Sequence, residues 1–318
     1  MFDPMTLSLQ RAATTRVSAW LLAAAALVGC AGGEARVLRA PSERLCARLQ
    51  PVMAPERAPM PDVEFRLRTA GFSPQAIAAA QATGAAPALV GLAELRTRDT
   101  VAPLRLHREV SNAIMLGMLD VASTVAEIDC EGERGDQLRG QLQAVLDRRT
   151  RQLGIASIMM GATTAALTGG LSLAGAANAG NIAGIAGGGG EAGLALSLVF
   201  GEAEGELITS RNLLAEVWAR PARPVLLPRS VWRYLTQPDP DGSTRLDRLH
   251  AEWRTPELLG EPDSETERRR AALLFGPGGR FTPAELEIRD AMLDLLEASV
   301  ALMNQDLRAL LLEVAARP

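Results

Sequence analysis

The sequence predicts an all-α protein built from long helices with coiled-coil-like packing and a Gly/Ala-rich hydrophobic helical hairpin. Aromatic residues make up only 3% of the chain, and runs of alternating β-branched residues are scarce. Alanine, leucine, arginine and glutamate, which favour helices, dominate the composition. Two stretches carry apolar residues at heptad spacing, and a long segment between them is almost free of charge.

The chain begins with the features of an export signal. Arg11 and Arg16 form a basic region, and an apolar run, VSAWLLAAAALV, follows over residues 17–28. The run has the length of a signal-peptide core and is too short to span a membrane comfortably. It ends in Leu27-Val28-Gly29-Cys30, which resembles the lipobox of bacterial lipoproteins.

This resemblance implies cleavage before Cys30, with residues 1–29 as signal peptide and residues 30–41 as a lipidated tether. The implied partner is membrane lipid, held through acylated Cys30, because several acyl chains on one residue anchor a protein stably where one does not. Ala31 stands where an Asp retains enteric lipoproteins in the inner membrane, so the resemblance implies the outer membrane, facing the periplasm. The alternative is an ordinary signal peptide with an incidental cysteine.

Two cysteines, Cys46 and Cys130, remain after Cys30. In an oxidising envelope compartment an even number of cysteines favours a disulfide, and two buried free thiols are the alternative. The only histidines, His107 and His250, have no ligand spacing, which argues against a metal site.

The remaining composition indicates no enzyme. The formal net charge of −4 argues against a nucleic-acid partner. No lysine occurs, which excludes a Walker phosphate loop and Schiff-base catalysis. Serine-hydrolase, zinc-protease and Cys-x-x-Cys motifs are absent as well, so we predict no catalytic residue and no cofactor. Two acidic clusters and one basic run are predicted to be solvated faces or helix-start charges: Glu127/Asp129, Asp263/Glu265/Glu267 and Arg268-Arg269-Arg270.

Residues 42–152 are predicted to form an N-terminal helical region. Ser73-Pro74 has the pattern of a helix start, with serine as the N-cap and proline in the first turn. The stretch CEGERGD at 130–136 is predicted to break or bend a long helix that begins near Leu106. That helix carries a heptad seam before the break and resumes after it: Ile114, Met118, Val121, Val125 and Ile128, then Leu138, Leu142 and Val145.

Residues 204–318 are predicted to form a C-terminal helical region. It begins with a helix over about 204–219, continues with a short helix capped by Ser230, and is interrupted at 276–279. The last helix opens with a capping box, Thr282-Pro283-Ala284-Glu285. Its seam has seven positions: Leu293, Leu296, Val300, Met303, Leu307, Leu310 and Val314. We expect this seam to pack against the 106–128 helix, with an intermolecular coiled coil as the alternative.

Residues 153–203 form the predicted hairpin. No residue from Leu153 to Gly190 is charged, and a single helix over that stretch would be about 57 Å long, against roughly 30 Å for a hydrocarbon core. A segment that enters a membrane must therefore turn back, most simply at 178–181. The first arm, 153–176, is apolar enough to span. Glu191 in the second arm, 182–201, would need a partner, water or an interfacial position.

Small residues recur every four positions in this segment and would allow close helix contacts in lipid. The candidate membrane or oligomer contacts are Ser157, Gly161, Ala165 and Gly169 on the first arm, and Gly180, Gly184, Gly188 and Gly193 around and after the turn, with Gly189, Ser197, Gly201 and Gly205 extending a second row. Because more than half of residues 157–205 are Gly, Ala, Ser or Thr, composition carries more weight here than spacing.

The architecture, a lipobox plus a Gly-rich hairpin, is similar to that of some outer-membrane lipoproteins, such as plasmid-encoded surface-exclusion lipoproteins, and of helical pore-forming toxins. No motif is shared, so no residue roles carry over. The leading hypothesis is a non-enzymatic envelope lipoprotein whose hairpin mediates membrane association or homo-oligomer assembly. The alternative is a periplasm-facing binding or adaptor module for an envelope protein, with the hairpin buried in a soluble helical core.

Overall fold

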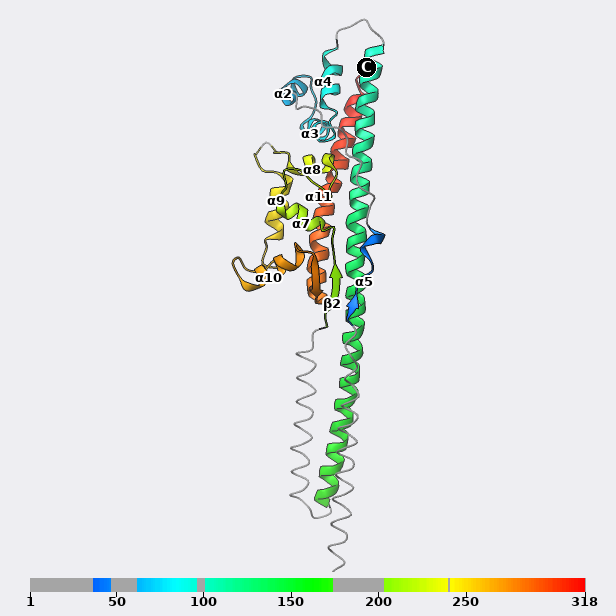
Figure 1. The fold of residues 1–318 in the computed structure, drawn as a ribbon, viewed down its shortest axis with the longest axis vertical. Helices are drawn as coiled ribbons and strands as arrows, with labels where there is room; N and C mark the ends of the chain where they lie inside the picture. The colour runs from blue at the N-terminus through cyan, green and yellow to red at the C-terminus, as the bar shows by residue number, and fades with distance from the viewer. Residues whose placement is uncertain (1–36, 47–61, 96–100, 174–202, 240, 318) are drawn as a thin grey trace, which may run out of the picture. The chain divides into compact units, whose positions relative to one another are not determined.

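The computed structural model describes residues 37–46, 62–95, 101–173, 203–239 and 241–317, apart from the side chains of Leu45 and of several residues in 156–173. Residues Leu38–Pro318 form one compact unit, which holds all the elements below. The fold is all-α, as predicted (Figure 1). Its elements are β1 (Leu38–Arg39), the 3-10 helix η1 (Glu43–Leu45), α2 (Val63–Thr69), α3 (Pro74–Thr83), α4 (Ala86–Glu94), α5 (Val101–Leu173), β2 (Gly205–Ile208), α7 (Leu213–Ala219), α8 (Arg229–Thr236), α9 (Arg245–Trp253), α10 (Glu265–Leu274), β3 (Gly278–Phe281) and α11 (Pro283–Ala315).

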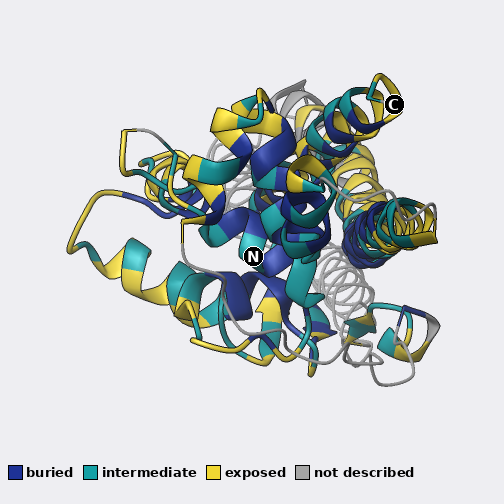
Figure 2. Ribbon diagram, turned by 90° about the horizontal axis from the view of Figure 1, so that it is seen from above, coloured by how far each residue is buried: buried dark blue, intermediate teal, exposed yellow. Residues whose placement is uncertain are grey.

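The long helices α5 and α11 lie side by side and form the spine of this unit (Figure 1). The predicted packing of the C-terminal helix against the 106–128 helix is therefore confirmed. Thr282 and Glu285 make the predicted capping box at the start of α11. All seven predicted seam positions of α11, from Leu293 to Val314, are buried. Buried residues occupy the helix faces that are turned toward one another (Figure 2).

The seam of α5 differs in register from the prediction. Met118 is 50% exposed, and the position that faces α11 is its neighbour Gly117. A Cβ at Gly117 would lie 2.6 Å from the Thr83 methyl carbon and 3.4 Å from a Leu307 methyl carbon, so this close approach of helices needs glycine. The buried row of α5 still has heptad spacing: Val110, Ile114, Gly117, Val121, Thr124, Ile128, Glu131, Leu138 and Leu142. The pattern was correct, but a glycine and a threonine hold positions assigned to Met118 and Val125.

The predicted break at 130–136 is wrong, because α5 runs through it without interruption. Gly132 and Gly135 serve helix packing there instead. A Cβ at Gly132 would lie 3.1 Å from the Asp290 carboxylate, and one at Gly135 would lie 3.7 Å from the Arg289 guanidinium. The absence of side chains at these glycines leaves space on α5 for the Asp290 and Arg289 side chains of α11.

After Leu142 the character of α5 changes. None of the residues from 143 to 165 whose exposure is described is buried. The described side chains of this part of α5 are therefore half-buried or exposed and lie outside the core.

A small three-stranded sheet, which the sequence did not predict, lies beside α5. β1 pairs in parallel with β2, and β2 pairs antiparallel with β3. The predicted helix over 204–219 is therefore too long: Gly205 begins a strand, and α7 starts only after Asn212, whose side chain caps it. Gly278 has a φ of +92°, and a Cβ there would lie 2.1 Å from the Leu207 carbonyl oxygen.

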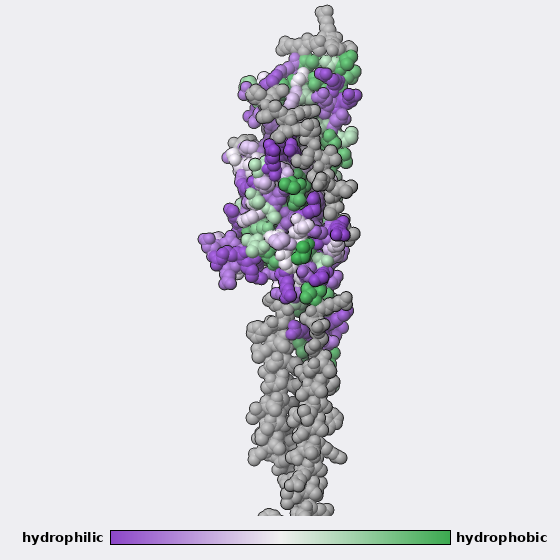
Figure 3. Space-filling model, in the orientation of Figure 1, coloured by the Kyte–Doolittle hydropathy of each residue, from purple (hydrophilic) through white to green (hydrophobic). Residues whose placement is uncertain are grey.

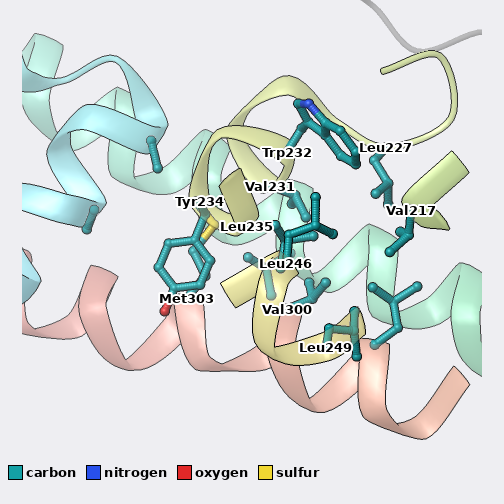
Figure 4. Packing of buried hydrophobic residues seen from close by; sticks show 14 of the residues in the cluster. Val217, Leu227, Val231, Trp232, Tyr234, Leu235, Leu246, Leu249, Val300 and Met303 are labelled. Atoms are coloured by element: carbon teal, nitrogen blue, oxygen red, sulfur yellow. The ribbon is translucent and has the colours of Figure 1, made fainter. Parts of the chain in front are cut away.

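The short helices cover the spine in two groups. α3 starts at Pro74 with Ser73 as its N-cap, as predicted, and packs against α11 and α8. α8 starts one residue before the predicted cap, because Pro228 occupies the N-cap and Ser230 bonds to Asp120 of α5. Buried side chains of α7, α8 and α9 meet those of α11 in the core, and Tyr234 lies beside Met303 (Figure 4). The regions 42–152 and 204–318 thus share one core.

Candidate functional site

The first candidate site is the set of contacts that joins residues 37–46, at the start of the folded unit, to α5. We call it the clamp. Cys46, directly after η1, lies at disulfide distance from Cys130 in the middle of α5, with the two Cα atoms 5.6 Å apart. The predicted cysteine pair is confirmed in this sense, and Cys46 is buried. The clamp joins residues that are 84 positions apart in the sequence.

A buried ionic triad begins at the next residue of α5, Glu131. The Glu131 carboxylate accepts hydrogen bonds from Arg134 at 2.7 and 2.8 Å and from Arg289 of α11 at 2.9 Å. The three side chains are only 4–5% exposed. Arg134 also donates to the carbonyl oxygens of Pro41 and Ile208, both at 2.9 Å. One buried carboxylate thus connects α5, α11, β2 and the segment after β1.

A second set of polar contacts strengthens the same clamp. The Glu43 carboxylate accepts hydrogen bonds from the Ser210 hydroxyl and, at 2.7 Å, from the Ser210 amide. These bonds hold the pKa of Glu43 below its usual range, although partial burial opposes them. Glu127, predicted to be a solvated acid, is 8% exposed and pairs with Arg211 at 3.1 Å. The segment that follows the predicted lipid site is therefore held to α5 by the cysteine pair and by the hydrogen bond from Arg134 to the Pro41 carbonyl, and to the residues after β2 by Glu43.

The second candidate site is a groove of ≈ 820 Å³ between α3, α11 and the α8–α9 region. Tyr234 donates a hydrogen bond to the Asp306 carboxylate at 2.9 Å, and Arg245 approaches the same oxygen at 3.4 Å while its guanidinium lies 4.0 Å from the Tyr234 ring centre. Burial raises the pKa of Asp306, while the contacts with Tyr234 and Arg245 lower it. Burial, assisted by the Asp306 charge, also raises the pKa of the Tyr234 hydroxyl.

The groove combines paired charges with uncharged polar groups. Arg68 pairs with Glu64, and Arg248 pairs with Asp239. The rim also carries four glutamines: Gln75, Gln81, Gln237 and Gln305. Hydrophilic and hydrophobic residues alternate over the face of the described part shown in Figure 3. Such a lining suits a polar ligand of low net charge, since the arginines and carboxylates already satisfy one another.

An aromatic stack fills the space between α7, α9 and α10. The Trp218 ring lies 4.2 Å from the Phe275 ring and 5.0 Å from the His250 ring, and both pairs are nearly parallel. His250 is 4% exposed, and one of its ring nitrogens contacts the Val217 carbonyl oxygen at 3.0 Å. Among the described residues, no group of three or more His, Cys, Asp or Glu side chains is arranged to hold a metal ion.

His250 should make the stability of the protein depend on pH. Burial lowers its pKa from 6.5, and the nearby Arg220 and Arg254 charges add to this effect. Below pH 6.5 the unfolded chain therefore binds a proton at His250 that the folded chain does not. The contribution of His250 to the free energy of unfolding is fully present above pH 6.5 and is lost as the pH decreases toward the folded-state pKa. We expect wild type to lose more free energy of unfolding than His250→Gln does between about pH 7.5 and about pH 5.5.

Urea unfolding at the two pH values measures this difference, and His107→Gln on α5 is the matched control. A His107→Gln protein should keep the wild-type pH dependence. Equal losses in wild type and His250→Gln would show that His250 does not titrate with unfolding.

The predicted hairpin residues fall mostly outside the described part of the chain. Ser157 is half-buried and Ala165 is exposed on α5, and Gly161 and Gly169 lie on the same helix. Gly180, Gly184, Gly188 and Gly193 lie outside the described residues, as do the turn at 178–181 and Glu191. No helix in the described ranges has both the length and the apolar character to cross a membrane, so the predicted transmembrane arm is not found there.

Sequence reasoning missed several residues of these sites. Glu131 carries a weak signal, because it lies on the buried heptad row of α5, where a charged side chain needs a partner such as Arg134 or Arg289. Arg269 is 62% exposed, as predicted, and also pairs with Glu285, whereas Arg270 is half-buried and donates to the Leu258 carbonyl oxygen. No local sequence pattern predicts the groove, because its central residues come from three separate helices.

Comparison with known proteins adds no relative. No protein-family model, curated protein or solved structure matches this chain. The functional argument therefore depends on the residues themselves.

Proposed function

We propose that this protein is a non-enzymatic lipoprotein of the cell envelope. Lipid on Cys30 holds a helical body at the outer membrane, facing the periplasm, and residues 153–203 mediate membrane association or self-assembly. The observation that carries the proposal is the order of basic region, apolar run and Leu27-Val28-Gly29-Cys30. A cysteine pair at disulfide distance agrees with an oxidising compartment.

The clamp supports this role on mechanical grounds. A lipid anchor transmits force and orientation to a protein only if the chain near the anchor is fixed to the folded body. Leu38 pairs with β2, and Cys46 and the Pro41 carbonyl are both held to α5. The tether therefore joins the folded unit at a short, firmly fixed segment.

Mass spectrometry of the N-terminal peptide and fractionation of cell membranes test the proposal. We expect the N-terminal peptide of the mature protein to begin at Cys30 and to carry acyl chains, and Ala31→Ser is a control that keeps the cysteine. A mature chain with Cys30→Ala, exported behind an ordinary cleavable signal peptide, should lose the acyl mass but remain partly membrane-associated or oligomeric. An unmodified wild-type Cys30 would refute the anchor, and a fully soluble, monomeric Cys30→Ala protein would refute the role of residues 153–203.

A second candidate is a binding or adaptor module, and the groove is the observation that favours it. Its centre is polar: Tyr234 is buried, and the side chains of Arg245 and Asp306 are 15% and 13% exposed. Crosslinking in cells from a photoreactive residue at Gln75 should then capture one defined envelope component. The same experiment from Arg223, which lies outside the groove, is the control.

A further inference from the structure

One face of α5 changes from basic to apolar just where the helix leaves the core. Arg148, Arg151, Ile155 and Ile158 follow one another at spacings of three, four and three, which places them on one side of a helix. The row continues with Ala162 and Ala165, and all six residues are exposed. Ile155 is 54% and Ile158 75% exposed. We call this row the α5 outer face.

The basic end of this face carries more positive charge than its surroundings neutralise. Arg148, Arg149 and Arg151 lie within one helical turn, and Asp147 is the acidic neighbour. None of the three arginines forms an ion pair with another residue of the described ranges. Arg134 and Arg139, earlier on the same helix, each pair with a carboxylate. Arginines without an ion-pair partner in the described part of the chain, next to exposed isoleucines, are typical of a surface that meets anionic headgroups and the start of the acyl region.

Chain length places this face within reach of the proposed lipid anchor. Cys30 is eight residues before Leu38, and such a tether spans at most roughly 29 Å. Leu38 pairs with Gly205, which packs against Leu138 of α5. From Leu138 to Leu153, where the long uncharged segment begins, α5 rises about 22 Å. A bilayer that holds acyl chains on Cys30 therefore lies close enough to be met by the α5 outer face.

We propose that the α5 outer face docks on an anionic phospholipid surface, with Arg148 and Arg151 at the headgroups and Ile155 and Ile158 at the acyl boundary. This inference rests on the proposed function and adds the lipid chemistry that the helix recognises. A nucleic acid would also attract arginines, but the acidic chain as a whole and the adjacent exposed isoleucines favour lipid.

The test uses the mature chain, residues 30–318, with Cys30→Ala, so that acyl chains do not determine binding. We expect it to cosediment with vesicles of phosphatidylcholine plus phosphatidylglycerol far better than with phosphatidylcholine alone, and to be released by salt. Arg148→Gln/Arg151→Gln should weaken binding to the anionic vesicles about 30-fold, from roughly one factor of five per arginine.

Arg105→Gln/Arg108→Gln is the matched control, because both arginines are exposed and equally spaced at the other end of α5. It should bind like the parent chain. Equal binding by all three proteins, or no preference for anionic vesicles, would overturn the inference. Acylation of Cys30 in cells is measured separately: its loss would refute the anchor without changing the vesicle result, and unchanged acylation with no vesicle binding would refute the docking face alone.

Discussion

Removing the Cys46–Cys130 link is expected to lower the free energy of unfolding by roughly 4 kcal/mol, because a link that closes a loop of this length restricts the unfolded chain strongly. The two cysteines are 84 residues apart, so the loop includes α2, α3, α4 and the first part of α5. Cys46→Ala/Cys130→Ala is the appropriate variant, since alanine adds no buried hydroxyl next to the core.

Urea unfolding with and without reductant measures this effect. Wild type should lose most of the difference on reduction, whereas the double-alanine protein should not respond to reductant. Wild-type stability that is insensitive to a reductant strong enough to reduce an unfolded control would mean that the two cysteines are free thiols. The same loss should free residues 37–46 for proteolysis, because the remaining contacts there are a two-residue strand and a few polar bonds.

Predictions from the sequence succeeded where one local pattern determined one element. The α11 seam and the caps at Ser73 and Thr282 depend on residues within a few positions of one another, and the structure confirms them. The pairing of α11 with α5 was also correct, because two long helices with complementary apolar seams bury most surface against each other.

The errors came from glycines and charges whose role depends on distant residues. Gly132 and Gly135 resemble helix breakers, but both are buried within a continuous helix, and a Cβ at Gly132 would lie only 3.1 Å from the Asp290 carboxylate of α11. Gly117 displaced Met118 from the seam for the same reason. The sheet escaped prediction because β1 has two residues and β2 four, which is too short for an alternating pattern to show.

The candidate sites were predictable to different degrees. Cysteine count and compartment alone predicted the Cys46–Cys130 pair. The groove could not be predicted, since Tyr234, Arg245 and Asp306 are brought together only by the packing of α8, α9 and α11. The basic-to-apolar transition at Arg151 and Leu153 was visible in the sequence, but its exposure followed only from the end of the buried row at Leu142.

Breaking the buried triad should cost nearly as much as removing the cysteine link. In Arg289→Met, the Glu131 carboxylate loses one of its two cationic partners while remaining almost completely buried. Arg134 still pairs with Glu131, so the cost comes from the two hydrogen bonds that the Arg289 guanidinium donates to the Glu131 carbonyl and carboxylate, at about 1.5–3 kcal/mol each. Urea unfolding at neutral pH should show a loss of this size for Arg289→Met.

An exposed ion pair on the same protein provides the control. Arg68 and Glu64 are each 59% exposed, so Arg68→Met should change stability by less than about 1 kcal/mol. The double variant Glu131→Gln/Arg289→Met should be less destabilised than the sum of its two single variants, since each single variant already loses the same Glu131–Arg289 contact. Additive losses would show that Glu131 and Arg289 act independently, and the triad would then be three separate contacts with main-chain carbonyls. A strong coupling would instead mean that one carboxylate holds α5, α11 and the segment at residues 38–41 in a fixed arrangement, which is the property that the proposed membrane-anchored body would require.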